Sequence, residues 1–115
     1  MKTKYGAKAV VYANVADGIK FLLMHRILNW VGWEFVKGEI EGEENAASAV
    51  KREVAEETGI NDIEEIKKIP GKDSWYAGGM NYAYEVFLVR VPYIEEIKLA
   101  THVVEHDLYK WCSAQ

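Results

Sequence analysis

The chain has 115 residues, of which 50% are hydrophobic and 28% are charged, and its formal net charge is −4. This length and composition fit a single domain over residues 1–115, and the acidic balance argues against a basic nucleic-acid-binding face. No apolar run is long enough to cross a membrane, and the lone cysteine, Cys112, excludes an intrachain disulfide. We therefore expect a cytoplasmic protein with no membrane partner and no stable nucleic-acid partner.

Two strands are predicted in the N-terminal part of the chain. Residues 4–15 are rich in β-branched and aromatic residues, and residues 19–26 follow a turn signal at Asp17–Gly18, so the two segments are predicted to form a hairpin. Residues 29–44 are rich in glycine and polar residues. We expect a loop there, interrupted by a short strand at 33–36.

One helix is predicted, over residues 45–58. Asn45 is a suitable N-cap, and Gly59 suits the left-handed position that follows the last helical turn. Between them, apolar residues at helical spacing form one face of the helix: Ala46, Ala47, Val50 and Val54.

Three further strands are expected after this helix. Residues 62–71 are predicted as a strand, although their charges also permit a helix; residues 81–91 form a strong strand pattern, and residues 105–112 a last short one. Strands on both sides of one helix predict a mixed sheet with the helix packed on it, which is an α/β (α+β) fold class.

The end of the predicted helix carries an unusual group of acids. Glu53, Glu56 and Glu57 lie within five positions, at the end where the helix dipole disfavours negative charge. Glu53 and Glu57 share one face, and Arg52 is placed to brace Glu56. Such acids raise one another's pKa unless a cation lies among them, and Mg²⁺ prefers oxygen ligands. A magnesium site and a solvated acidic surface are therefore the two interpretations of this segment alone.

The wider segment 38–60 decides between them. It reads GEIEGEENAASAVKREVAEETGI and resembles the Nudix box, the signature of the Nudix hydrolase family. The residues that match the fixed positions of that box are Gly38, Glu44, Arg52, Glu53, Val54, Glu56, Glu57, Gly59 and Ile60. The resemblance implies an α/β/α sandwich with a mixed β-sheet, in which the box forms a loop–helix–loop.

The resemblance also implies an activity and the residues that perform it. The activity is hydrolysis of a nucleoside diphosphate linked to another moiety, by water attack on phosphorus, with Mg²⁺ or Mn²⁺. Glu53, Glu57 and the carbonyl of Gly38 are expected to hold metal. Glu56 is expected to be a further ligand or a base, and Arg52 to orient a glutamate.

Substrate choice must come from residues outside the box. The segment WEFVKG resembles a stretch of diadenosine polyphosphate and RNA 5′-end pyrophosphohydrolases, with Val36 where a proline is usual. Lys37 in this segment is a candidate phosphate contact, with a solvated loop lysine as the alternative. Arg26, at the end of the second predicted strand, is a second candidate, which could instead cap the strand edge.

The segment EHDLYKW, residues 105–111, is more specific. It resembles the corresponding segment of asymmetrical diadenosine tetraphosphate hydrolases, in which the glutamate lies close to the metals. Glu105 is therefore a candidate ligand or general base, and a salt bridge at the strand edge is the alternative.

An adenine base would need an aromatic surface. Tyr82 and Tyr84 share one face of a predicted strand, where they could stack on a base or belong to the core. Tyr76, on the loop side of the Gly78–Gly79 turn, is the preferred stacking candidate.

The chain also departs from the family pattern, because family members continue after this tryptophan into a helix that covers the second sheet face. This chain stops at CSAQ, so the C-terminal helix is expected to be missing: either the sequence is truncated or the covering helix comes from elsewhere. An uncovered apolar face predicts a homodimer.

The sequence thus favours hydrolysis of diadenosine tetraphosphate to ATP and AMP. Two alternatives remain: another nucleotide or RNA 5′-end pyrophosphohydrolase, and a catalytically silent Nudix-fold nucleotide-binding module.

Overall fold

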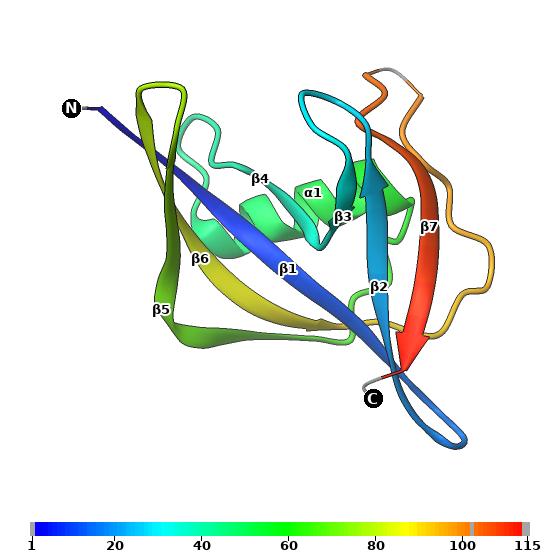
Figure 1. Cartoon of the computed structure of the whole chain (residues 1–115). Helices are drawn as coiled ribbons and strands as arrows, with labels where there is room; N and C mark the ends of the chain where they lie inside the picture. The colour runs from blue at the N-terminus through cyan, green and yellow to red at the C-terminus, as the bar shows by residue number, and fades with distance from the viewer. Residues whose placement is uncertain (1, 102, 114–115) are drawn as a thin grey trace.

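A computed structural model describes residues 2–101 and 103–113 of the chain. These residues form one helix and seven strands in a single sheet (Figure 1). The elements in chain order are β1 (Thr3–Val15), β2 (Gly18–Arg26), β3 (Gly32–Glu34), β4 (Val36–Glu39), α1 (Ala46–Thr58), β5 (Glu65–Ala77), β6 (Met80–Arg90) and β7 (His106–Ser113).

The sheet is mixed, as predicted. Its strand order is β3-β2-β1-β6-β5, with β4 paired to β1 and β7 paired to β2. β1 and β6 are parallel and every other pair is antiparallel. β1 pairs with β2 through Tyr12–Val15 and with β4 through Gly6–Ala9, so one long strand positions both.

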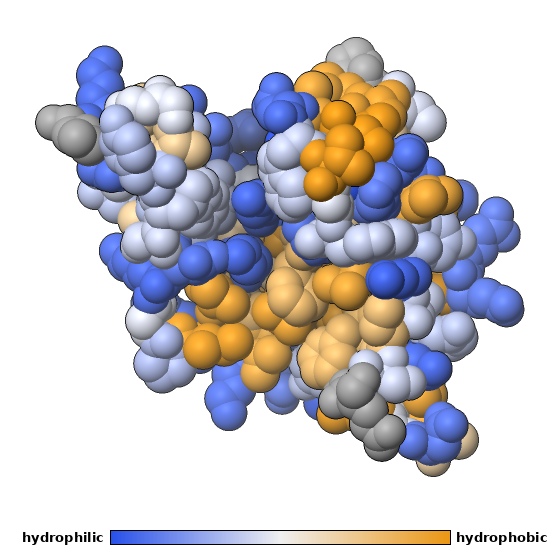
Figure 2. Space-filling model, viewed as in Figure 1, coloured by the Kyte–Doolittle hydropathy of each residue, from blue (hydrophilic) through white to orange (hydrophobic). Residues whose placement is uncertain are grey.

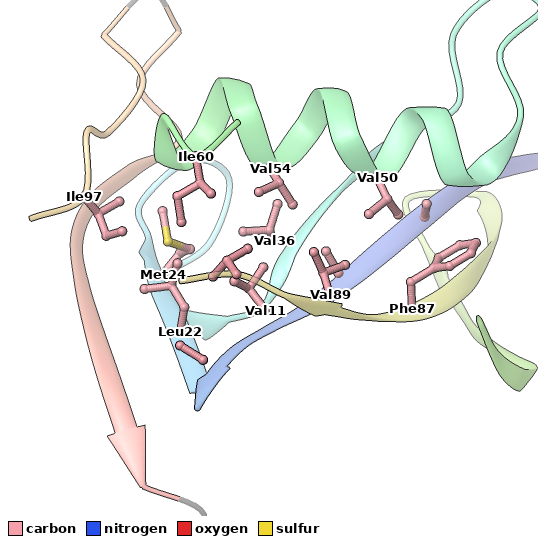
Figure 3. Packing of buried hydrophobic residues seen from close by; sticks show 14 of the residues in the cluster. Val11, Leu22, Met24, Val36, Val50, Val54, Ile60, Phe87, Val89 and Ile97 are labelled. Carbon is pink, nitrogen blue, oxygen red and sulfur yellow. The ribbon is translucent and has the colours of Figure 1, made fainter. Parts of the chain in front are cut away.

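The core lies between this sheet and α1. Alternate residues of β1 point toward the helix, and these are almost fully buried: Ala7, Ala9, Val11 and Ala13. Val50 and Val54 supply the helix side of the same core (Figure 3). The apolar face predicted for the helix is therefore the one that packs on the sheet.

The opposite face of the sheet carries half-buried apolar residues. Val10 pairs with Leu88 and Tyr12 pairs with Phe21, which places these four side chains on the face turned away from α1. Figure 2 shows apolar surface gathered over the strands on this side. Within the described ranges α1 is the single helix, so the second helical layer of the predicted α/β/α sandwich is not present there. None of the described helical residues forms a helix that could span a membrane.

The helix has the ends that the sequence predicts. Asn45 Oδ1 accepts a hydrogen bond from the backbone N–H of Ser48 at 2.8 Å. Gly59 adopts the left-handed conformation, with φ of 77°, and its N–H donates to the carbonyl of Ala55 at 3.0 Å.

Two elements differ from the prediction. The short strand expected at 33–36 is divided into β3 and β4, and residues 37–39, expected as loop, belong to β4 because the long β1 offers them an antiparallel partner. The strand expected at 62–71 begins at Glu65 and continues to Ala77, with a register irregularity between Ile69 and Lys72 where Pro70 interrupts the ladder. Tyr76 therefore lies within a strand and not in a loop.

Candidate functional site

The acidic residues of α1 occupy different environments. Glu53 and Glu57 share the face that meets the sheet and are only 8% and 7% exposed. Glu56 is exposed and lies 3.4 Å from the guanidinium of Arg52. Gly38, in β4, comes so close to Glu53 that a Cβ there would overlap the carboxyl group. The glycine therefore allows the backbone of β4 to reach the buried acids.

Arg52 supports this arrangement from the side. Its Nη1 donates to Glu53 Oε1 at 2.7 Å, and its Nη2 donates to Glu44 Oε1 at 2.7 Å and to the Glu39 carbonyl at 2.9 Å. The same Glu44 oxygen accepts the N–H of Glu41 at 2.8 Å. One guanidinium thus connects the helix, β4 and the loop between them.

These carboxylates are held where negative charge is unfavourable. Burial, together with the charges of Glu56 and Glu57, raises the pKa of Glu53 to about 7, against the lowering effect of Arg52. Burial and the charge of Glu57 also raise the pKa of Glu105. Buried oxygen donors that resist ionisation without a counter-charge suit a hard divalent cation. The donor set therefore fits a metal of this kind.

Glu105 reaches the site from the other end of the chain. It lies immediately before β7, and ligand atoms of Glu57, Glu105 and His106 all lie within 4.8 Å of one another. The backbone N–H of Ile27 donates to the Glu105 carbonyl at 2.9 Å, which ties this segment to the end of β2.

A buried histidine connects two acids across the site. His106 Nδ1 lies 3.0 Å from Glu57 Oε2, and Nε2 lies 2.8 Å from Glu34 Oε2. Burial lowers the pKa of His106, but the hydrogen bonds to Glu34 and Glu57 outweigh it and raise the pKa to about 9. Burial alone would raise the pKa of Glu34, yet hydrogen bonds from His106 and Arg26 hold it below the usual value.

The two predicted phosphate-binding cations lie beside this cluster. Arg26 Nη1 donates to Glu34 Oε2 at 3.1 Å, and Lys37 Nζ lies 3.6 Å from Glu34 Oε1. Lys37 Nζ also lies 4.6 Å from the ring centroid of Trp75. The lysine therefore stands between acidic and aromatic side chains.

Acidic, basic and aromatic side chains all line one cavity of about 460 Å³. The lining residues that matter for chemistry are Arg26, Lys37, Gly38, Glu53, Trp75, Tyr82, Tyr84 and Glu105. Glu56 and Glu57 line a neighbouring hollow together with Thr101 and Val103.

The aromatic part of the cavity differs from the expectation. Trp75 and Tyr82 are cross-strand partners whose rings stack, with centroids 5.2 Å apart and an interplanar angle of 10°. Tyr84 is 5% exposed and packs against Trp75. Tyr76 is 60% exposed and does not line the cavity, because neighbouring residues of a strand point to opposite faces.

The structure thus brings together predicted residues from distant segments and leaves two at the margin. Glu56 is exposed and lines the neighbouring hollow instead of the 460 Å³ cavity, and the side chain of Tyr76 points away from that cavity. The sequence patterns assigned no role to Glu34, and included His106 only as the neighbour of Glu105. The adjacent Glu105 was the one feature of the sequence that drew attention to His106. Glu34 is a single acid in a three-residue strand, and no sequence pattern marks it as a site residue.

Comparison with known proteins identifies the fold. The NUDIX domain model matches residues 4–115. The structure of an Ap4A hydrolase from C. elegans, in a binary complex, is similar with a TM-score of 0.79 and 26% identity, over 96% of this chain and 80% of that chain. No curated protein matches the sequence.

Two further structures are similar at the level of the fold alone. The dihydroneopterin triphosphate pyrophosphohydrolase of E. coli has a TM-score of 0.78 and 24% identity, over 99% of this chain and 84% of that one. The NUDIX domain of NrtR from Shewanella oneidensis, complexed with ADP ribose, has a TM-score of 0.77 and 17% identity, over 98% of this chain and 74% of that one.

Proposed function

Since the chain belongs to the Nudix family and is a hydrolase that acts on pyrophosphate bonds, we propose that its substrate is diadenosine tetraphosphate, which water cleaves to ATP and AMP. Residues 1–115 form one hydrolase domain in this proposal, with the Nudix box at 38–60 and a location in the cytoplasm. Its partner is a small nucleotide, and no nucleic acid or membrane is involved.

The observation that carries this proposal is the composition of the 460 Å³ cavity. A stacked pair, Trp75 and Tyr82, offers an aromatic surface for an adenine base. Lys37 lies over Trp75 and near Glu34, where the phosphate chain of a stacked nucleotide would pass toward the acids. Arg26 lines the same cavity and adds a second cation for the phosphates.

A divalent cation completes the site in this proposal. Glu53, Glu57 and the Gly38 carbonyl would hold Mg²⁺ or Mn²⁺, and the exposed Glu56 would add a further ligand. When bound, the metal neutralises charge on phosphate oxygens and acidifies water. Glu105 would accept the proton of the attacking water, and burial, which raises the pKa of this residue, makes its carboxylate a stronger base.

Two other functions remain as alternatives. A different nucleotide or an RNA 5′ end could be the substrate, as the name of the E. coli pyrophosphohydrolase illustrates for one triphosphate. A catalytically silent binding module is the alternative outside the enzymes, and the NrtR domain bound to ADP ribose shares the fold. Retention of all three box glutamates, with Glu53 and Glu57 buried, favours the hydrolase.

Substitution of the aromatic residues tests the substrate proposal. Trp75→Ala is expected to raise KM for diadenosine tetraphosphate by about tenfold, since stacking on a base contributes on the order of 1–3 kcal/mol. Tyr76→Ala is the comparison, because Tyr76 is the stacking residue preferred from the sequence but does not line the cavity. A larger effect of Tyr76→Ala on KM would contradict the proposed position of the adenine on Trp75 and Tyr82.

A further inference from the structure

His106 is enclosed by charged groups from three elements. Its side chain is 3% exposed. Glu57, near the end of α1, contacts one ring nitrogen, and Glu34, in β3, contacts the other. Arg26 holds the same Glu34 oxygen from β2. These contacts link Arg26, which lines the cavity, through Glu34 and His106 to Glu57 of the Nudix box.

The geometry of these contacts sets the role of the ring. An ionised carboxylate only accepts hydrogen bonds, so each ring nitrogen that faces one must donate an N–H. A ring that donates from Nδ1 and from Nε2 keeps no lone pair for a metal. His106 therefore lies beside the metal-binding acids as a support and not as a ligand, although its atoms fall within the cluster formed with Glu57 and Glu105.

His106 supports two acids, Glu57 and Glu105. The bond to His106 fixes Oε2 of Glu57, and the second oxygen of that carboxylate would remain for a cation. The ring also anchors the first residue of β7, and Glu105 is the residue just before it. The Ile27–Glu105 backbone bond holds the same segment on its other side.

We propose that His106 is a positioning residue: its Nδ1–H orients the Glu57 carboxylate for metal binding and its place in β7 sets the position of Glu105. This inference rests on the metal role proposed above for Glu57. Hydrogen-bonded groups behind metal ligands usually change metal affinity by about 10- to 100-fold when they are removed.

Two amide variants separate the two ring nitrogens. The side-chain amide of Asn places its N–H close to the position of histidine Nδ1, whereas the longer Gln places it close to Nε2. His106→Asn keeps a donor for Glu57 and is expected to bind Mn²⁺ within about twofold of the unaltered protein. His106→Gln keeps the donor for Glu34 and loses the one for Glu57, so its Mn²⁺ affinity is expected to fall about tenfold.

Titration calorimetry with Mn²⁺, on proteins whose folding is checked by thermal unfolding, measures this difference. The control is His25→Asn, because His25 Nδ1 contacts Asp107 Oδ1 at 2.6 Å between β2 and β7, outside the cavity. The control is expected to bind Mn²⁺ as the unaltered protein does. Equal affinities of the Asn and Gln variants would overturn the inference. Absence of Mn²⁺ binding by the unaltered protein would instead overturn the metal site itself.

A measurement on the unaltered protein applies even where the variants do not fold. The ¹H–¹⁵N spectrum of the histidine rings is expected to show protons on both nitrogens of His106, before and after Mg²⁺ is added. Loss of one proton on addition of Mg²⁺ would show a ligand, and would overturn the supporting role.

Discussion

Glu53 is the residue on which the electrostatics of the site depend most. It is 8% exposed and accepts a hydrogen bond from Arg52, yet burial still raises its pKa to about 7. The folded protein therefore favours the protonated acid, and its ionisation destabilises the fold unless a cation is bound. The same feature that would bind metal weakens the metal-free protein.

This leads to a stability prediction with a definite sign. The folded-state pKa of Glu53 lies above the usual value of 4.5, so its favourable contribution is complete below pH 4.5 and is lost as pH rises through about 7. In EDTA, the free energy of unfolding of the unaltered protein is expected to fall by about 3 kcal/mol relative to that of Glu53→Gln across this range. Chemical denaturation at several pH values measures the difference. A constant difference from pH 4.5 to pH 8 would contradict the environment described for Glu53.

Catalysis provides a second prediction at this scale. Glu57→Gln keeps the size of the side chain but removes a charge beside Glu105 and His106, and we expect turnover with Mg²⁺ to fall by several orders of magnitude. Glu43→Gln is the matched control, because Glu43 is an exposed glutamate of the same segment. Near-normal kcat for Glu57→Gln in a pyrophosphatase assay would contradict the proposed role of Glu57 as a metal ligand.

Sequence could predict some of these residues and not others. Fixed spacing indicated Arg52, Glu53 and Glu57 as candidates, and all three lie on α1. Glu34 could not be predicted, because its partner His106 lies 72 residues away in the sequence, in β7. Contacts that depend on tertiary pairing leave no local pattern.

At the scale of elements, the approach of β4 to α1 positions the side chains that are proposed to bind metal. β4 pairs with β1 and brings Gly38 against Glu53. The helix and its caps could be predicted from Asn45, Gly59 and the apolar spacing, since these signals are local. The formation of β4 could not, because only the free edge of β1 makes that segment a strand.

Gly38→Ala tests this approach. A Cβ at this position would overlap the Glu53 carboxyl, so we expect the side chain to be displaced and Mn²⁺ affinity to fall at least tenfold. The fold is expected to persist, because Gly38 does not have a positive φ. Calorimetric titration with Mn²⁺ and a thermal melt provide the two measurements. Unchanged affinity in a folded variant would show that β4 does not constrain Glu53.

At the scale of the whole molecule, one face of the sheet packs on α1 (Figure 1). By strand register, the half-buried side chains of Val10, Tyr12, Phe21 and Leu88 lie on the other face. An apolar surface that is only partly covered favours association. The homodimer expected from the sequence therefore stays a prediction, and light scattering at micromolar concentration is expected to give twice the mass of the chain. Tyr12→Lys, placed in the centre of this face, is expected to yield monomer. A monodisperse monomer for the unaltered protein would end this idea.

The central claim concerns the whole site, and product analysis tests it most directly. The protein would be offered diadenosine tetraphosphate, ADP-ribose, an oxidised deoxynucleoside triphosphate and a 5′-triphosphate RNA in parallel, with Mg²⁺ or with EDTA. Anion-exchange chromatography would identify the products. We predict equal amounts of ATP and AMP from diadenosine tetraphosphate, ahead of the other substrates and only with Mg²⁺. Faster turnover of another substrate, or two molecules of ADP from diadenosine tetraphosphate, would contradict the proposed substrate and cleavage.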